Sequence, residues 1–410
     1  MKTKPALLLL SFLAAVLLVP PCDAGAAWAR RYDTRGPAMA TRLAALPHGE
    51  IAVITQSVVF TVGEEGTVKA ARRWPGGISF SGAGPAGLYV GGLVSPLPGQ
   101  GRPFLALARL DASLEVGWSR TYVTPSDAHY VIWSVDGAPD GDVVAAGEVA
   151  SAAVLFRFDS QGRPRWGLIL NLSGTESLSA VRSTADGGCV AAGRNSGGAW
   201  LVKIARDGSV EWQKTFTGSR RFEAVAVAKD GTIIAAGSSF AHPFVASVSA
   251  KGEPRWQRVG TSESRVNALA VEADGSILAL ADTRGRQPGP VVLRLDASGS
   301  LLWSRRFTRA LTPSVLLPPN VLTTAGGRVV IAPPLPENDR SQKFVLYAID
   351  AATGTTPCAS IEDAKEVLDK AAVPVETPDI EQRSVQLHVE EESVAPIPAS
   401  VTTLPWQCET

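Results

Sequence analysis

A glycine–tryptophan spacing recurs along this chain and constrains its fold more than any other feature. A tryptophan follows a glycine by four residues at Trp166, Trp212, Trp256 and Trp303, and Trp28 and Trp118 occupy the same place in their cycles. Two cycles depart from the rule, with Ala70 after Gly66 and Cys358 after Gly354. The eight positions recur about every 42 to 55 residues, which is the size of a four-stranded propeller blade.

Each cycle is predicted to contain four short strands. Asp-Gly pairs at 140–141, 186–187, 230–231 and 274–275 separate alternating runs, and this dipeptide is the strongest short signal for a hairpin. Ala-Ala-Gly at 145–147, 191–193 and 235–237 supplies small side chains for inner strands that crowd near an axis. No helical periodicity separates the cycles, so a propeller is favoured over a helical solenoid.

The two ends of the repeat complement each other. The first position lies in a strand with no blade of its own, Ala27 to Asp33, while the last cycle, Val315 to Asp350, supplies three strands. Pairing of the first strand with the last sheet would remove the exposed edges of an open array. We therefore predict an all-β, seven-bladed β-propeller of four-stranded blades over residues 27–358, closed by its N-terminal strand.

The N-terminal segment 1–26 has the features of a secretory signal peptide. Lys2 and Lys4 precede the apolar run Ala6 to Val19, and Ala24-Gly25-Ala26 offers a small-residue cleavage site. An uncleaved anchor and a lipid on Cys22 are the alternatives, although the residues before Cys22 lack a lipobox. No later run is long and apolar enough for a membrane helix. We expect an exported protein that is extracellular, periplasmic or on the cell surface, with no stable membrane span after signal removal.

Residues 359–410 form an acidic, proline-containing C-terminal tail. Cys358 and Cys408 flank it and are the natural disulfide pair in an oxidising compartment, with a stabilisation of ~4 kcal/mol. Ser360 to Asp363 resembles a capping box, which predicts a short helix to about Ala371. Beyond it we expect an extended segment that lies on the propeller. Cys189, within an apolar strand, is expected to be a buried free thiol.

The last cycle resembles the repeat of pyrroloquinoline-quinone-type propellers. Their pattern is Ala-x-Asp-x-x-Thr-Gly followed by tryptophan, and here Ala348, Asp350, Thr353 and Gly354 match it, with Cys358 in the tryptophan position. The cycles also resemble those of secreted bacterial and archaeal propellers of unassigned function. The resemblance covers about residues 27–358 and implies the fold, not an activity. Quinone dehydrogenases carry adjacent cysteines over the cofactor, and this sequence has no Cys-Cys pair.

No constellation with catalytic, cofactor-binding or metal-binding spacing is recognisable in the sequence. The four histidines are scattered without ligand spacing. Asp136, Asp140 and Asp142 cluster, but without the glycine and distal glutamate of a calcium loop, so a hairpin turn is the better interpretation. We therefore predict no cofactor and no metal, and the balanced overall charge gives no reason to expect nucleic acid as a partner.

Long connections mark one face of the predicted propeller as its functional surface. Two of the four connections in each cycle are long and variable, and both emerge on the same face; loops held by a rigid scaffold concentrate binding residues. Arg220 and Arg221 lie there, and solvated rim charges are favoured over an anion site.

The leading hypothesis is a monomeric, non-catalytic propeller that binds a protein or surface polysaccharide through this loop-rich face. One alternative is a polysaccharide lyase or hydrolase with its site at the channel mouth, and another is an envelope assembly scaffold. Three or more charged side chains converging in a concave channel would favour the enzyme, and an apolar or empty channel the binder.

Overall fold

The computed structural model is composed almost entirely of β-strands. It describes residues 27–34, 40–74, 77–94, 104–123, 130–171, 174–283, 289–307, 322–325, 327–332 and 343–355, and short tail segments at 361–364, 367–371, 373–378, 381–385, 388–390, 397–399 and 402–404. One short 3-10 helix, η1 (Pro47–Gly49), interrupts the strands. None of the helices in these ranges is long and apolar enough to cross a membrane.

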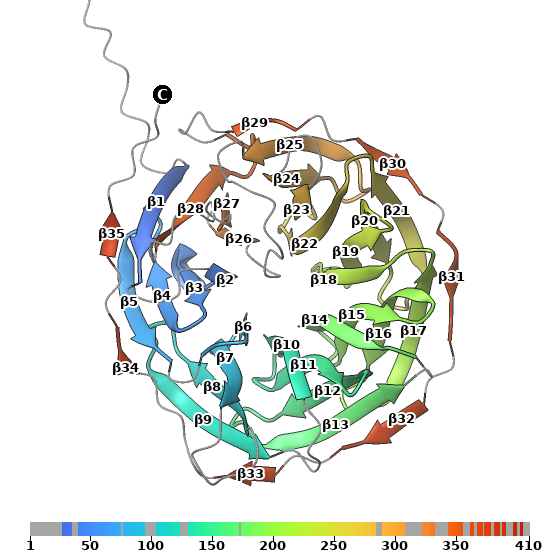
Figure 1. Cartoon of the computed structure of the whole chain (residues 1–410), viewed down its shortest axis with the longest axis horizontal. Helices are drawn as coiled ribbons and strands as arrows, with labels where there is room; N and C mark the ends of the chain where they lie inside the picture. Colours follow the sequence, from blue (N-terminus) through green and yellow to red (C-terminus); the bar gives the residue numbers. More distant parts are fainter. Residues whose placement is uncertain are drawn as a thin grey trace, which may run out of the picture.

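Seven antiparallel sheets are arranged around a central axis, as Figure 1 shows. Blade 1 comprises β2 (Ala40–Ala45), β3 (Ile51–Thr55), β4 (Val58–Val62) and β5 (Val68–Arg73). Blade 2 comprises β6 (Phe80–Gly84), β7 (Gly87–Val94), β8 (Phe104–Leu110) and β9 (Val116–Val123). Blade 3 comprises β10 (Tyr130–Gly137), β11 (Val143–Val149), β12 (Ala152–Phe158) and β13 (Pro164–Asn171).

The remaining blades follow the same order from the axis outward. Blade 4 comprises β14 (Ser177–Ser183), β15 (Cys189–Asn195), β16 (Gly198–Ile204) and β17 (Val210–Thr217). Blade 5 comprises β18 (Arg221–Val227), β19 (Ile233–Ser239), β20 (His242–Val248) and β21 (Pro254–Gly260). Blade 6 comprises β22 (Ser264–Val271), β23 (Ile277–Thr283), β24 (Gly289–Leu295) and β25 (Leu301–Phe307). Blade 7 comprises β26 (Leu322–Ala325), β27 (Arg328–Ile331), β28 (Lys343–Asp350) and β1 (Trp28–Asp33).

Blade 7 closes the ring with strands from both ends of the repeat. The N-terminal strand β1 pairs antiparallel with β28 over its whole length, from Trp28 opposite Ala348 to Asp33 opposite Lys343. Figure 1 shows the blue β1 beside the orange β28. The predicted seven-bladed propeller and its closure by the N-terminal strand are thus confirmed.

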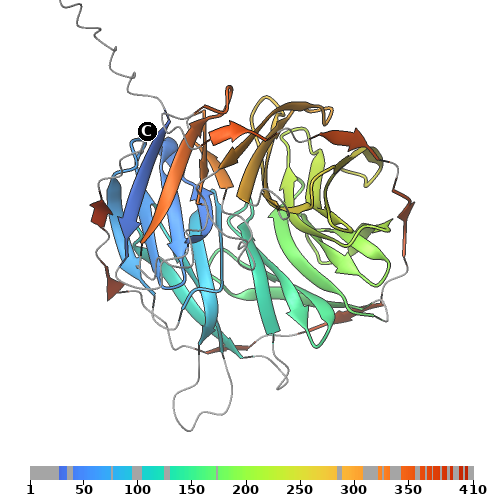
Figure 2. The same ribbon diagram turned by 45° about the horizontal axis from the view of Figure 1, so that its top comes forward.

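The acidic tail forms a belt around the rim and adds a fifth strand to every blade. Its strands are β29 (Ile361–Asp363), β30 (Leu368–Lys370), β31 (Val375–Glu376), β32 (Glu381–Ser384), β33 (His388–Glu390), β34 (Ile397–Pro398) and β35 (Thr402–Leu404). They pair with the outermost strands of blades 6, 5, 4, 3, 2, 1 and 7, in that order. The tail therefore makes one full circuit in the direction opposite to the blades (Figures 1 and 2).

Two expectations for the tail fare differently. The expectation of an extended segment lying on the propeller agrees with the belt. The predicted short helix from Ser360 to about Ala371 is wrong, because β29 and β30 lie within that range. The backbone groups that a helix would satisfy internally are satisfied here by the edges of β25 and β21.

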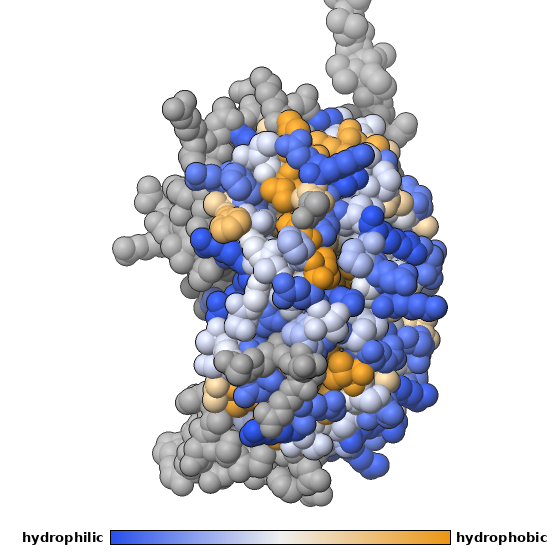
Figure 3. All heavy atoms as spheres, turned by 90° about the vertical axis from the view of Figure 1, so that its right-hand side faces the viewer, coloured by the Kyte–Doolittle hydropathy of each residue, from blue (hydrophilic) through white to orange (hydrophobic). Residues whose placement is uncertain are grey.

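Side chains hold the belt as well as backbone pairing. Gln257 of β21 accepts a hydrogen bond from the backbone N–H of Val373 at 2.9 Å and donates to its carbonyl at 3.0 Å. Lys214 of β17 donates to Thr377 at 2.7 Å, and Gln382 donates to the carbonyl of Gly208 at 2.9 Å. Figure 3 views part of this rim, where the most hydrophobic residues in view form an interrupted line among hydrophilic ones.

The repeated tryptophans bridge neighbouring blades. The indole N–H of Trp118 in blade 2 donates to the carbonyl of Ser160 in blade 3 at 2.9 Å, and its ring lies against Gly162, where a Cβ would come within 2.7 Å of it. The same bond links five other pairs, Trp28–Glu64, Trp166–Arg206, Trp212–Ala250, Trp256–Ala297 and Trp303–Ala352. Each ring lies over the glycine two residues further on. The glycine that precedes one tryptophan by four residues thus receives the tryptophan of the previous blade.

Blades 1 and 2 meet through a complementary exchange of the same two positions. Ala70 stands in the tryptophan position of blade 1, and Leu114 stands in the glycine position of blade 2 with a φ of 62°. Leu114 is fully buried in a cluster against which Ala70 packs. At this contact the large side chain is therefore contributed by blade 2 and not by blade 1. Leu114 adopts a left-handed backbone conformation, which is unfavourable for a leucine.

Of the cysteines discussed above, Cys189 lies within the described residues. Cys189 is a buried free cysteine, as predicted, and burial raises the pKa of its thiol to about 12. Cys358 and Cys408 lie outside the described residues, so their disulfide stays a prediction. The strands that precede the two cysteines in the sequence are β28 and β35, and both pair with β1. β35 runs antiparallel to β1 toward Trp28, and Trp28 pairs with Ala348 near the end of β28, so both strands end toward the Trp28 end of β1. The segment 1–26 also lies outside the described residues.

Replacing Ala70 and Leu114 with the tryptophan and glycine found at the other blade contacts tests this contact. Leu114→Gly alone should lower the free energy of unfolding by about 2–4 kcal/mol, because it empties a buried leucine site. Ala70→Trp alone should also destabilise, since the ring would overpack against Leu114. Ala70→Trp with Leu114→Gly should recover at least about 2 kcal/mol of the summed losses in urea unfolding. Additive losses would contradict the exchange.

Removing the belt tests its role at the sheet edges. A chain lacking residues 361–410 would expose the outer edge of all seven blades, and exposed edges pair with other chains. We expect a lower melting temperature and concentration-dependent association by size-exclusion chromatography with light scattering. A truncated chain that stays monomeric and melts at the temperature of the full chain would show that the edges need no cover.

Candidate functional site

The seven innermost strands surround a cavity of about 310 Å³ on the propeller axis. Every blade contributes to its wall, through β2, β6, β10, β14, β18, β22 and β26. Most of the wall is small or apolar, including Ala44, Gly82, Val227, Leu269 and Leu322. Three charged side chains stand out among these lining residues, namely Arg42, Asp136 and Arg182.

Arg42 reaches the cavity from a position that a residue with a small side chain occupies in the other bulged inner strands. It follows a β-bulge in β2, and the residues after the corresponding bulges are Ser134, Ala180, Ala224 and Ala268. Arg42 is only 5% exposed and donates a hydrogen bond to the carbonyl of Trp133 two blades away. The inner strand of blade 2 packs directly against β10, because a Cβ on Gly82 would overlap the carbonyl oxygen of Val135.

Asp136 and Arg182 occupy equivalent positions in the neighbouring strands β10 and β14. The Asp136 carboxylate accepts the backbone N–H of Ser183 at 2.8 Å, and its other oxygen lies 4.0 Å from Nε of Arg182. Burial raises the pKa of Asp136, and Arg182 and Ser183 oppose that rise. The carboxylate thus fixes the base of the Arg182 side chain, which is 27% exposed.

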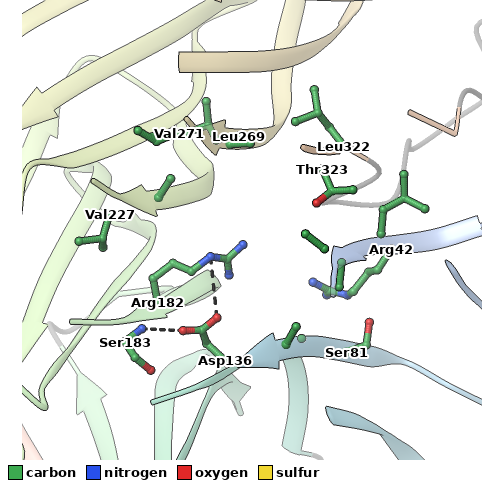
Figure 4. Close-up of a pocket in the computed structure, with 17 residues that line it drawn as sticks. Arg42, Ser81, Asp136, Arg182, Ser183, Val227, Leu269, Val271, Leu322 and Thr323 are labelled. Atoms are coloured by element: carbon green, nitrogen blue, oxygen red, sulfur yellow. Dashed lines mark hydrogen bonds and ion pairs between the residues drawn. The ribbon is translucent and has the colours of Figure 1, made fainter. Parts of the chain in front are cut away.

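The two arginines face each other across the cavity. Figure 4 shows their guanidinium groups pointing toward one another from β2 and β14. Burial lowers the pKa of Arg42 to about 9, and the positive charge of Arg182 acts in the same direction. Like charges in a poorly hydrated space repel, so this arrangement favours an anion between them.

A second hollow, of about 400 Å³, lies on the loop-rich face over blades 4, 5 and 6. Four arginines line it with two glutamates, and these residues are Arg194, Arg220, Arg221, Arg265, Glu223 and Glu263. Arg221 donates to Ser179 at 2.6 Å and lies 3.4 Å from Glu223. The Nε of Arg265 is buried and lacks a hydrogen-bond partner among the described residues. The hollow therefore keeps an excess of positive charge.

Phe240 borders this hollow in an unusual conformation. It is 65% exposed and has a φ of 53° in the turn between β19 and β20. A bulky residue with a left-handed backbone is strained, and such strain is concentrated at functional sites. The exposed ring gives the arginine hollow an apolar edge.

Five inner strands carry a β-bulge near the loop-rich face. The extra residues are Thr41, Trp133, Ser179, Glu223 and Asn267. Two of them are Trp133, which is 38% exposed, and Glu223. The glycine–tryptophan repeat did not indicate either residue. Bulges re-aim side chains and are frequent beside active sites. A repeated group of four residues could have indicated these bulges from the sequence. It consists of an apolar residue, a variable residue, Ala or Ser, and a second apolar residue, as in Leu178 to Val181 and Val266 to Leu269.

The residues singled out in the sequence fall into separate regions. The six repeat tryptophans lie at the blade contacts, away from the cavity-lining residues. Arg220 and Arg221 line the loop-rich hollow together, so the structure brings them to a concave surface and not to an open rim. Asp140 and Asp142 pair with the buried Arg157 at 2.9 and 2.8 Å in a hairpin turn, whereas Asp136 faces the channel.

Within the described ranges, no group of three or more His, Cys, Asp or Glu side chains could hold a metal ion. Arg42, Asp136 and Arg182 do meet the criterion of three charged side chains converging in a concave channel. The channel is therefore neither empty nor purely apolar.

Comparison with known proteins supports the class of fold and nothing narrower. No protein-family model and no curated protein matches the chain. A structure titled streptogramin B lyase is similar, with 11% identity, 78% of this chain and 97% of that chain covered, and a TM-score of 0.52. The WD40 domain of Neurospora crassa Pan2 has 11% identity, coverage of 78% and 95%, and a TM-score of 0.44. The chain is thus a seven-bladed β-propeller, and these similarities do not single out the quinoprotein-type repeat family.

Proposed function

We propose that this protein is an exported binding propeller that captures an anionic protein or surface polymer on its loop-rich face. The observation that supports it best is the hollow over blades 4 to 6, where four arginines meet two glutamates. Guanidinium groups bind carboxylates and sulfates in a bidentate manner, so several of them together select an anionic chain. Phe240 adds an apolar contact at the edge of the hollow.

The scaffold agrees with a binding role. Each outermost strand pairs with a belt strand of two to four residues, and so short an edge does not favour extension of the sheet by a partner. The loop-rich face carries the hollow in which arginines outnumber acidic residues. Export follows from the signal-like segment 1–26, and the proposed partners therefore belong to the extracellular, periplasmic or cell-surface environment.

A binding experiment with matched variants tests the role of the face. Polyglutamate and polygalacturonate serve as anionic probes and dextran as the neutral probe. The Arg194→Gln, Arg220→Gln double variant should weaken binding to the anionic probes at least ~10-fold, because each charged hydrogen bond contributes about 1.5–3 kcal/mol. Affinity should also fall steeply with salt.

Arg163→Gln combined with Lys251→Gln is the control for this experiment. Arg163 is exposed in the turn between β12 and β13, and Lys251 is exposed in the turn between β20 and β21, so that the control also removes two positive charges outside the hollow. It should bind like the wild type. Equal affinities for the double variant and the wild type, or equal binding to dextran, would reject the face as the site.

A polysaccharide lyase or hydrolase is the second candidate, and the channel charges favour it. The Arg42–Arg182 pair could hold the carboxylate of a uronic acid, and Asp136, whose pKa is raised by burial, could hold a proton beside it. A screen against polygalacturonate, alginate and neutral glucans should then show turnover. Asp136→Asn should reduce that turnover at least ~100-fold, the usual contribution of a general acid or base, while circular dichroism stays unchanged. Absence of turnover by the wild type would leave the binding function alone.

A further inference from the structure

The channel holds an uncompensated positive charge. Arg42 has no ion-pair partner among the described residues, and the carboxylate of Asp136 is engaged by Arg182 and by the N–H of Ser183. The hydrogen bond of Arg42 to the Trp133 carbonyl uses one of its five N–H donors. A charged residue that is only 5% exposed is costly to bury unless a partner or a ligand accepts hydrogen bonds from it.

One further donor in the wall lacks a partner. The hydroxyl oxygen of Ser81 is buried without a hydrogen-bond partner among the described residues, and Ser81 lines the cavity from blade 2. Ser183 lies beside Asp136, to which its backbone N–H donates. Buried hydroxyls are normally satisfied, and each unsatisfied one calls for an explanation.

The second arginine is held in place for the same task. Asp136 accepts the Ser183 N–H at 2.8 Å and so keeps its other oxygen beside Nε of Arg182. Nη1 of Arg182 donates to the carbonyl of Val181 at 2.8 Å, and the guanidinium group faces Arg42, as Figure 4 shows. The positive charge of Arg182 adds to the lowering of the pKa of Arg42, and a bound anion would reverse that effect.

We propose that the central channel binds a small oxyanion, a carboxylate or phosphate group, between Arg42 and Arg182. Ser81 donates to it from blade 2, and Val227, Leu269 and Leu322 form an apolar part of the surrounding wall. The cavity of about 310 Å³ has room for a small molecule or for one sugar unit of a longer chain. This site is separate from the loop-rich hollow, and no residue is shared between them.

Isothermal titration calorimetry with the full chain tests the site. The probes are inorganic phosphate, sulfate and glucuronate, each titrated into the wild type, Arg182→Gln and Arg163→Gln. We expect binding to at least one probe, a loss of at least ~10-fold in Arg182→Gln, and no change in Arg163→Gln. Because Arg182 is partly exposed, this variant should fold, and circular dichroism verifies it. Phosphate or sulfate binding alone indicates a phosphoryl-type ligand, and glucuronate binding alone indicates a carboxylate.

A second variant separates this proposal from the function of the face. Arg194→Gln with Arg220→Gln should leave titration of the small anions unchanged, since both arginines lie outside the channel. Ser81→Ala should weaken binding by about 3- to 10-fold with the fold retained, because one neutral hydrogen bond is lost. No heat with any of the three probes, or equal affinity in wild type and Arg182→Gln, would overturn the proposal.

Discussion

The contact between a tryptophan and the turn of the next blade is the interaction on which this structure depends. The sheet pairing of the described repeat strands stays within each blade, so side-chain contacts do most to set the angle between neighbouring blades. The indole satisfies one turn carbonyl and covers one glycine, as in Trp212 with Ala250 and Gly252. Since the glycine precedes the next tryptophan by four residues, each turn fixes both its own strand and its neighbour. This explains why the spacing is the most regular feature of the sequence.

The ring is closed twice, by different physical means. Strand β1 completes blade 7 through six residue pairs with β28, which joins the ends of the repeat. The belt then crosses all seven outer strands and ends on β1 itself. The belt is acidic, and the outer strands carry residues such as Lys69, Arg258 and Arg305. Charge complementarity adds a modest, salt-dependent attraction to the backbone pairing.

The sequence was informative where physical signals are local. Asp-Gly hairpins, the glycine–tryptophan register and the short last cycle predicted the blades, their number and their closure. The belt was predicted only as an extended segment, because its strands are two to four residues long and prolines interrupt them, so no alternation can show. A capping-box pattern suggested a helix there, but the unpaired edge of β25 offered the chain a strand partner instead.

The channel illustrates the same limit at the candidate site. Arg42, Asp136 and Arg182 are far apart in sequence, and only the register of three bulged strands brings them together. Arg42 was detectable in principle, because it replaces a small residue in a recurring quartet. Its burial opposes stability, since an apolar or small residue serves that position in other blades. A small residue at position 42 would therefore be expected to give a more stable propeller. Blade packing does not require the two arginines or the unsatisfied hydroxyl of Ser81, and these are the groups that the proposed anion would satisfy.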